Sequence, residues 1–176
     1  DFRHFKIAFI GVGTVGQGLT EILLEKKELL AKKYDFQYSV VAISDFIKGS
    51  VYDEKGLDMK LILELVKQGK KIDDYPRGTK GMNAIDTIKK SNADTIIEVT
   101  YTDIKTGEPA ITHVKTALQS GKNVVSTNKG PVVKQVLELL ELAKENRVSY
   151  GFEGVVLAGT PAINLAFYTL AGNNIK

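Results

Sequence analysis

Cysteine is absent from this sequence of 176 residues. Disulfide bonds, thiolate metal sites and cysteine nucleophiles are therefore all excluded. Long apolar runs are also missing: none approaches the roughly 18 residues that a membrane-spanning helix needs, and no secretory signal opens the chain. We therefore expect a cytoplasmic protein that does not bind membranes.

The chain also lacks a large excess of charge of one sign. Its 24 basic and 21 acidic residues are mixed along the sequence, which leaves a net charge of +3. This balance argues against a nucleic-acid-binding surface as the main function. The two histidines, His4 and His113, have no partners in the sequence that suggest a metal site or a catalytic triad, so we assign neither to such chemistry.

Strands and helices are predicted to alternate along the chain. Apolar runs typical of buried parallel strands occur at residues 5–10, 38–45, 94–100, 122–126 and 147–152. Helical spacing occupies the segments between most of these runs, and one of these helices is predicted to start at Pro109 and end at Gly121. The spacing is weakest over residues 46–83, where it is limited to Leu57, Leu61, Ile62, Leu65 and Val66. One continuous first helix is predicted from a stripe of apolar residues: Val15, Leu19, Ile22, Leu23, Leu29 and Leu30. The fold class we expect is therefore α/β, with a doubly wound parallel sheet of the Rossmann type.

The first predicted strand leads into the glycine-rich stretch GVGTVG, residues 11–16. Alone, this motif predicts no more than a tight turn, but here a strand precedes it and a helix, a second strand and a carboxylate follow. In a dinucleotide-binding loop, Gly11 permits the turn, Gly13 lets the backbone approach a pyrophosphate, and Gly16 allows the helix to pack closely on the strand. The backbone of Val12, Thr14 and Val15 completes the predicted phosphate site at the helix N-terminus.

The choice between NAD and NADP depends on Asp45, which ends the second predicted strand. A carboxylate there can accept a hydrogen bond from a ribose 2′-hydroxyl and repel a 2′-phosphate. Lys48 follows closely and could instead serve a 2′-phosphate, and a third interpretation is a solvated turn formed by both residues. The sequence favours NAD and leaves NADP open.

A lysine stands in an unusual place in VVSTNKGP, residues 124–131. Pro131 is suited to the first position of a helix, and the N-terminus of a helix is unfavourable for a cation. Lys129 follows one predicted strand, and Thr100, Tyr101 and Thr102 follow another. The carboxyl ends of both strands should line the same ligand crevice. Lys129 is therefore a candidate for proton transfer to or from an alcohol or carbonyl, against the alternative of a lysine that caps neighbouring carbonyls.

Three stretches in this order carry a resemblance to a known family: GVGTVG, TGEPAITHVKTALQSGKNVVSTNKGP, and FEGVVLAGTPAI at residues 152–163. Together they resemble homoserine dehydrogenase over essentially the whole chain. The resemblance implies the NAD- or NADP-dependent interconversion of L-homoserine and L-aspartate 4-semialdehyde, a step toward threonine, methionine and isoleucine. It implies that Lys129 contacts the nicotinamide and substrate region, and that residues 100–102 border the cofactor.

The resemblance further implies a monovalent cation, such as sodium, bound in the stretch EGVVLAGTP. Its ligands would be the side chain of Glu153 and the backbone carbonyls of Val156, Ala158 and Thr160, and oxygen ligands suit a hard cation. Gly154-Val155 stands where the family commonly has Ala-Thr, which carbonyl ligation tolerates. The alternative is that Glu153 caps the next helix.

Homoserine dehydrogenases continue into a substrate and dimerisation domain, so the resemblance implies that this chain is a truncated part of a homodimeric enzyme. We expect residues 1–152 to form the dinucleotide-binding domain and residues 153–176 the hinge and first helix of the next, α+β domain. This fragment alone should turn over little or no homoserine. The alternatives are another amino-acid or small-aldehyde dehydrogenase, such as an aspartate dehydrogenase, and a non-enzymatic NAD-binding module.

Overall fold

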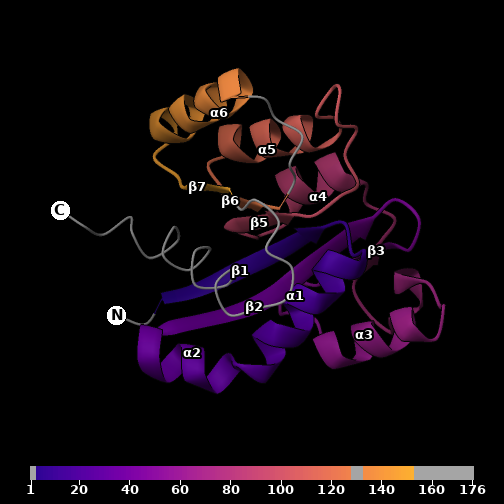
Figure 1. Ribbon diagram of the computed structural model, residues 1–176. Coiled ribbons are helices and arrows are strands. Elements are labelled where there is room, and N and C mark those ends of the chain that lie inside the picture. Colours follow the sequence, from indigo (N-terminus) through magenta and orange to yellow (C-terminus); the bar gives the residue numbers. More distant parts are fainter. Residues whose placement is uncertain (1–2, 128–132, 153–176) are drawn as a thin grey trace.

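The computed structural model describes residues 3–127 and 133–152 (Figure 1). Its seven strands are β1 (Arg3–Ile10), β2 (Phe36–Asp45), β3 (Gly49–Tyr52), β4 (Thr79–Lys80), β5 (Thr95–Glu98), β6 (Asn123–Ser126) and β7 (Tyr150–Phe152). The helices are α1 (Thr14–Glu25), α2 (Lys27–Tyr34), α3 (Met59–Lys67), α4 (Ala84–Lys90), α5 (Ala110–Gln119) and α6 (Val133–Glu145), with a short 3-10 helix, η1 (Ile72–Asp74).

The strands form one sheet in the order β4-β3-β2-β1-β5-β6-β7. The pairs from β2 through β1, β5 and β6 to β7 are parallel, as predicted for strands joined by helical crossovers. The expectation of a fully parallel sheet is wrong, because β3 pairs antiparallel to β2, and β4 antiparallel to β3. The reason is the connection after Asp45, which reverses the chain within three residues and so forms a hairpin where a crossover helix was expected.

Helices cover both faces of this sheet, as the doubly wound prediction requires (Figure 1). On one face α1, α2 and α3 pack over a core that includes Phe9, Leu23 and Ile62. On the other face α4, α5 and α6 enclose a second core that includes Ile10 and Leu118. Alternate residues of β1 thus point into different cores, which is why the strand reads as a continuous apolar run.

The single long first helix predicted from the apolar stripe is two helices. α1 ends at Glu25, and the non-helical backbone of Lys26 separates it from α2. Leu29 consequently leaves the buried face and is 51% exposed, whereas Leu30 is buried in the core. Helical spacing continued across the break because only one residue separates the two helices.

The weakly periodic segment at residues 46–83 contains β3, α3, η1 and β4, of which only α3 was predicted. α3 is well capped, since the Asp58 carboxylate accepts hydrogen bonds from the backbone N–H groups of Lys60 and Leu61. By contrast, the bounds of α5 agree with the sequence signals, because Pro109 precedes it and Gly121 follows it with a left-handed φ of +72°. In the described part of the chain, no helix has the length and apolarity to cross a membrane.

Candidate functional site

The glycine-rich loop joins the carboxyl end of β1 to α1, and its three glycines have different surroundings. Gly11 has a φ of +87°, and a Cβ there would lie 2.9 Å from the backbone nitrogen of Thr100. A Cβ at Gly16 would lie 3.1 Å from Cγ2 of Val99, so the helix packs directly on the segment after β5. A Cβ at Gly13 would meet no atom of the described residues within 4 Å. The space above Gly13 is therefore open to a ligand.

Gly13 is the N-cap residue of α1, and within residues 3–127 and 133–152 no side chain caps this helix end. The first turn of α1 also carries no acidic residue. Backbone N–H groups at a helix start have no partner within the helix, and they favour anionic ligands. Together with the open space above Gly13, this arrangement fits the pyrophosphate of a dinucleotide.

Asp45 lies beside the glycine loop and has backbone partners there. One oxygen of its carboxylate accepts the N–H of Val12 at 2.8 Å, although the two residues are 33 positions apart. The other oxygen accepts the N–H groups of Ile47 at 2.9 Å and Lys48 at 2.8 Å in the turn toward β3. Asp45 and Lys48 thus do form a turn, as one of the interpretations of the sequence expected. A carboxylate has room for further donors, so the predicted contact with a ribose hydroxyl remains open.

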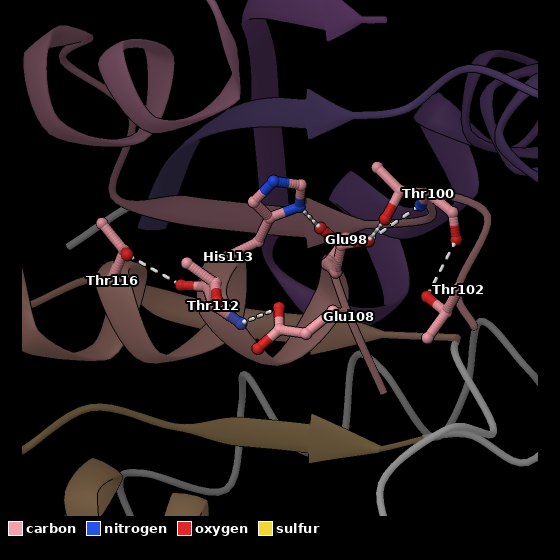
Figure 2. Close-up of polar contacts among 7 residues, drawn as sticks. All are labelled: Glu98, Thr100, Thr102, Glu108, Thr112, His113 and Thr116. Carbon is pink, nitrogen blue, oxygen red and sulfur yellow. Dashed lines mark hydrogen bonds and ion pairs between the residues drawn. The ribbon is translucent and has the colours of Figure 1, made fainter. Parts of the chain in front are cut away.

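The carboxyl end of β5 holds a buried polar network that connects strand, loop and helix (Figure 2). Glu98 is fully buried, and its Oε2 lies 2.6 Å from Nδ1 of His113 on α5. Its Oε1 accepts the backbone N–H of Thr100 at 2.8 Å and also the hydroxyl of Thr100. The Thr102 hydroxyl in turn lies 3.4 Å from the carbonyl oxygen of Thr100, which accepts its hydrogen bond. The network therefore fixes the start of the loop that follows β5.

The three residues predicted to border a cofactor after β5 differ in exposure. Thr100 and Thr102 are partly buried by the contacts just described, whereas Tyr101 is 92% exposed. Thr100 also packs against Gly11, so this loop and the glycine loop meet at the edge where β1 and β5 end. The structure therefore brings both predicted loops together.

The pair of Glu98 and His113 was not predicted from the sequence. The sequence contained a signal for the pair: Glu98 is the one charged residue within the apolar run TIIEV, and a carboxylate buried in a central strand requires a partner. His113 lies on the inward face of α5 beside Val114 and Ala117. The other histidine, His4, contacts the hydroxyl of Ser39 through Nε2 at 2.6 Å on the exposed end of β1.

Lys122 is buried outside this site, just before β6. Its ammonium group donates hydrogen bonds to the carbonyl oxygens of Ile88 and Ser91, the latter at 2.9 Å. Burial lowers the pKa of Lys122, and the nearby Asp94 partly opposes the shift. These contacts join α4 to β6, so this lysine is structural.

Lys129 and the predicted cation ligands Glu153, Val156, Ala158 and Thr160 lie outside the described residues. Their roles therefore stay predictions. Within residues 3–127 and 133–152, no cluster of three or more His, Asp or Glu side chains could hold a metal ion.

Comparison with known proteins shows which family has this sequence and fold. A sequence model of the family described as "Homoserine dehydrogenase, NAD binding domain" matches residues 11–153. A homoserine dehydrogenase of Methanocaldococcus jannaschii is 41% identical over 169 residues, which are 96% of this chain and 50% of that protein. An NAD(+)-dependent homoserine dehydrogenase of Pseudomonas canavaninivorans is 36% identical over 98% of this chain and 49% of its own length. The chain thus spans about half the length of these relatives.

A solved structure agrees with the sequence relatives. A hyperthermophilic archaeal homoserine dehydrogenase in complex with NADPH superposes with a TM-score of 0.74 at 26% identity, over 93% of this chain and 48% of that one. The resemblance inferred from the three sequence motifs is confirmed by these matches. The chain belongs to the homoserine dehydrogenase family, and its α/β sheet with the glycine-rich loop is the NAD-binding domain of that family.

Proposed function

We propose that the protein containing this chain is an NAD(P)-dependent homoserine dehydrogenase that interconverts L-homoserine and L-aspartate 4-semialdehyde. The observation that carries the proposal is the family match over residues 11–153, on a glycine loop whose middle residue, Gly13, is open to a ligand. The helix start at Gly13 supports an anionic ligand at that point, because its first turn has no acidic residue and no described side chain caps it.

In this proposal, the bound nicotinamide cofactor supplies or accepts the hydride. The backbone from Gly11 to Gly16 binds the pyrophosphate, and Asp45 binds the adenosine ribose beside it. Thr100, Tyr101 and Thr102 border the nicotinamide half. Lys129 holds a proton at the substrate oxygen: it stabilises the alkoxide that develops during aldehyde reduction and protonates it, and it takes the proton back during alcohol oxidation.

We propose NAD as the preferred cofactor, on the evidence of the charge next to the adenosine position. The Asp45 carboxylate lies at the end of β2, where it repels a 2′-phosphate. Its three backbone contacts hold that charge in place beside Val12. One relative is described as NAD(+)-dependent. NADP remains the second candidate, because a solved relative was studied in complex with NADPH.

The proposed enzyme is a homodimer in which residues 153–176 begin the substrate domain, and it binds a monovalent cation through Glu153 and the carbonyls of Val156, Ala158 and Thr160. These features are carried over from the family resemblance. The cation site can be tested separately in the complete protein. Its activity is measured with sodium and again with sodium replaced by a bulky organic cation.

The decisive experiment concerns Lys129 in the complete protein. Oxidation of homoserine with NAD⁺ and NADP⁺ should be detected by NAD(P)H absorbance, with aspartate and glucose 6-phosphate as comparison substrates. Lys129→Ala should lower kcat by about 10² to 10⁴-fold, and Lys129→Arg should fail to restore it across pH, because arginine keeps the charge but does not exchange a proton. The matched control is Lys115→Ala, at an exposed lysine of α5, which should leave kcat unchanged.

Three outcomes contradict parts of the proposal. Faster turnover of aspartate than of homoserine would make the protein a different amino-acid dehydrogenase. Cofactor binding without turnover of any of the three substrates would favour a binding module. Normal turnover by Lys129→Arg would remove proton transfer from the role of this lysine and leave an electrostatic one.

A further inference from the structure

The network around Glu98 requires an explanation beyond the packing of the sheet. Its carboxylate has no exposed surface, and burial of a carboxylate carries a large desolvation cost. The groups of His113 and Thr100 that bind it offset this cost. An apolar residue would fill the same place in β5 with no such requirement, as Ile96 and Ile97 do in the preceding positions.

The position of the network relates it to one half of the ligand site. Strand β1 lies between β2 and β5 in the sheet. Asp45, at the end of β2, marks the side where a dinucleotide places its adenosine ribose. The ends of β5 and β6 lie on the opposite side of the glycine loop, where the nicotinamide half must extend. Glu98 is the last residue of β5, so it lies at the strand end on that side of the glycine loop.

Thr100 connects the buried Glu98 to the loop at the surface of the site. Its backbone N–H and its hydroxyl both donate to Oε1 of the buried Glu98 (Figure 2), so both donors of Thr100 are directed into the protein. At the same time Thr100 packs against Gly11, where a Cβ would approach its nitrogen to 2.9 Å. The carboxylate therefore fixes both the loop after β5 and its contact with the glycine loop.

We propose that Glu98, oriented by His113, is a positioning residue of the dinucleotide site. Its carboxylate holds Thr100 inward and so sets the shape of the wall against which the nicotinamide half of the cofactor lies. This inference rests on the proposed function to the extent that it needs a dinucleotide in the site. It adds that two buried side chains, neither of them in contact with the cofactor, determine how well the nicotinamide half is bound.

A comparison of NADH with ADP-ribose separates positioning from fold stability, because ADP-ribose has the same adenosine and pyrophosphate but no nicotinamide. Dissociation constants of both should be measured by calorimetry for the folded proteins. Glu98→Leu, which removes every acceptor, should raise the Kd of NADH about tenfold, the loss expected for a charge-assisted hydrogen bond, and change that of ADP-ribose far less. Glu98→Gln should restore most of the NADH affinity, since its amide can still accept from Thr100 and donate to Nδ1 of a neutral His113.

A double-mutant cycle tests whether Glu98 acts through Thr100. Thr100→Val keeps the shape of the side chain and removes its hydroxyl, and it should weaken NADH binding in the parent. In a Glu98→Leu or Glu98→Gln background the same change should weaken binding less, because the charged acceptor is gone. The matched control is Thr116→Val on α5, whose hydroxyl donates to the carbonyl of Thr112 at 2.7 Å (Figure 2). It should change neither Kd and should not couple to Glu98.

The orienting role of His113 has its own pair of variants. His113→Asn retains a donor near the position of Nδ1 and should bind NADH like the parent, whereas His113→Leu should behave like Glu98→Leu. The control is His4→Leu, which removes the other histidine hydrogen bond, to Ser39, and should leave both ligands unaffected.

The outcomes separate this inference from the proposed function. A parent protein that binds neither NADH nor ADP-ribose overturns both. A parent that binds both, with Glu98→Leu showing parental NADH affinity, overturns this inference alone. If Glu98→Leu does not fold, the cycle of Glu98→Gln with Thr100→Val decides: smaller loss in the Gln background supports the inference, and additive losses overturn it.

Discussion

Two glycines of the loop after β1 should respond in opposite ways to the same substitution. Gly11→Ala introduces a Cβ at a φ of +87°, where it would also lie 2.9 Å from the nitrogen of Thr100 and 3.0 Å from its Cα. Gly13→Ala introduces a Cβ at a φ of −69° and ψ of −165°, a conformation open to any residue, and no atom in the described part of the chain lies within 4 Å of it. The first change should therefore act on folding, and the second on ligand binding.

The magnitudes follow from these surroundings. At Gly11 the left-handed backbone costs about 1–2 kcal/mol, and the contact with the backbone of Thr100 adds about 1–3 kcal/mol of overpacking. At Gly13 the loss of a favourable N-cap residue costs about 0.5–1 kcal/mol, while the reduced entropy of the unfolded chain returns about 0.4–1 kcal/mol. Gly11→Ala should thus destabilise the fold by about 2–5 kcal/mol, and Gly13→Ala should leave its stability nearly unchanged.

Urea denaturation measures the first quantity, and fluorescence titration with NADH the second. Gly13→Ala should weaken NADH binding about tenfold or more, because the methyl group occupies the space where the pyrophosphate must approach the backbone. Gly13→Val should weaken it further. The reasoning is refuted if Gly13→Val binds NADH as tightly as the parent, or if Gly11→Ala unfolds at the same urea concentration as Gly13→Ala.

Two further predictions concern charge. Asp45→Asn removes the negative charge and keeps one of the two oxygen acceptors, so it can retain either the contact with Val12 or those with Ile47 and Lys48. It should weaken NADH and improve NADPH binding by titration; equal losses for both would assign Asp45 to the turn alone. Tyr150→Phe should stabilise the protein by about 1 kcal/mol at pH 7, because its buried hydroxyl has no hydrogen-bond partner among the described residues. Burial raises the pKa of Tyr150 from 10.0 to about 12, so the folded state holds this proton more firmly. The parent should therefore lose stability relative to Tyr150→Phe as pH rises from 10 to 12, and parallel pH profiles of the two in urea denaturation would contradict this assignment.

The local features of this protein could be read directly from its sequence. The glycine loop, its place between a buried strand and a helix, and the bounds of α5 between Pro109 and Gly121 were predicted from neighbouring residues. Each depends on backbone conformation or on periodicity within a few turns of chain, which the amino acids determine locally. The family resemblance rested on the same short motifs.

The pairings between distant segments were decided only by the tertiary structure. The antiparallel β3 and β4 contain four and two residues, too few to show a period. β3 forms a strand because it pairs with the edge of β2, and β4 because it pairs with β3. Asp45 reaches Val12 across 33 positions, and Glu98 reaches His113 across 15. A sequence can show that a carboxylate in a buried strand needs a partner, because desolvation makes an isolated charge unfavourable. Which side chain becomes that partner depends on how α5 packs against β5, and only the folded sheet determines that.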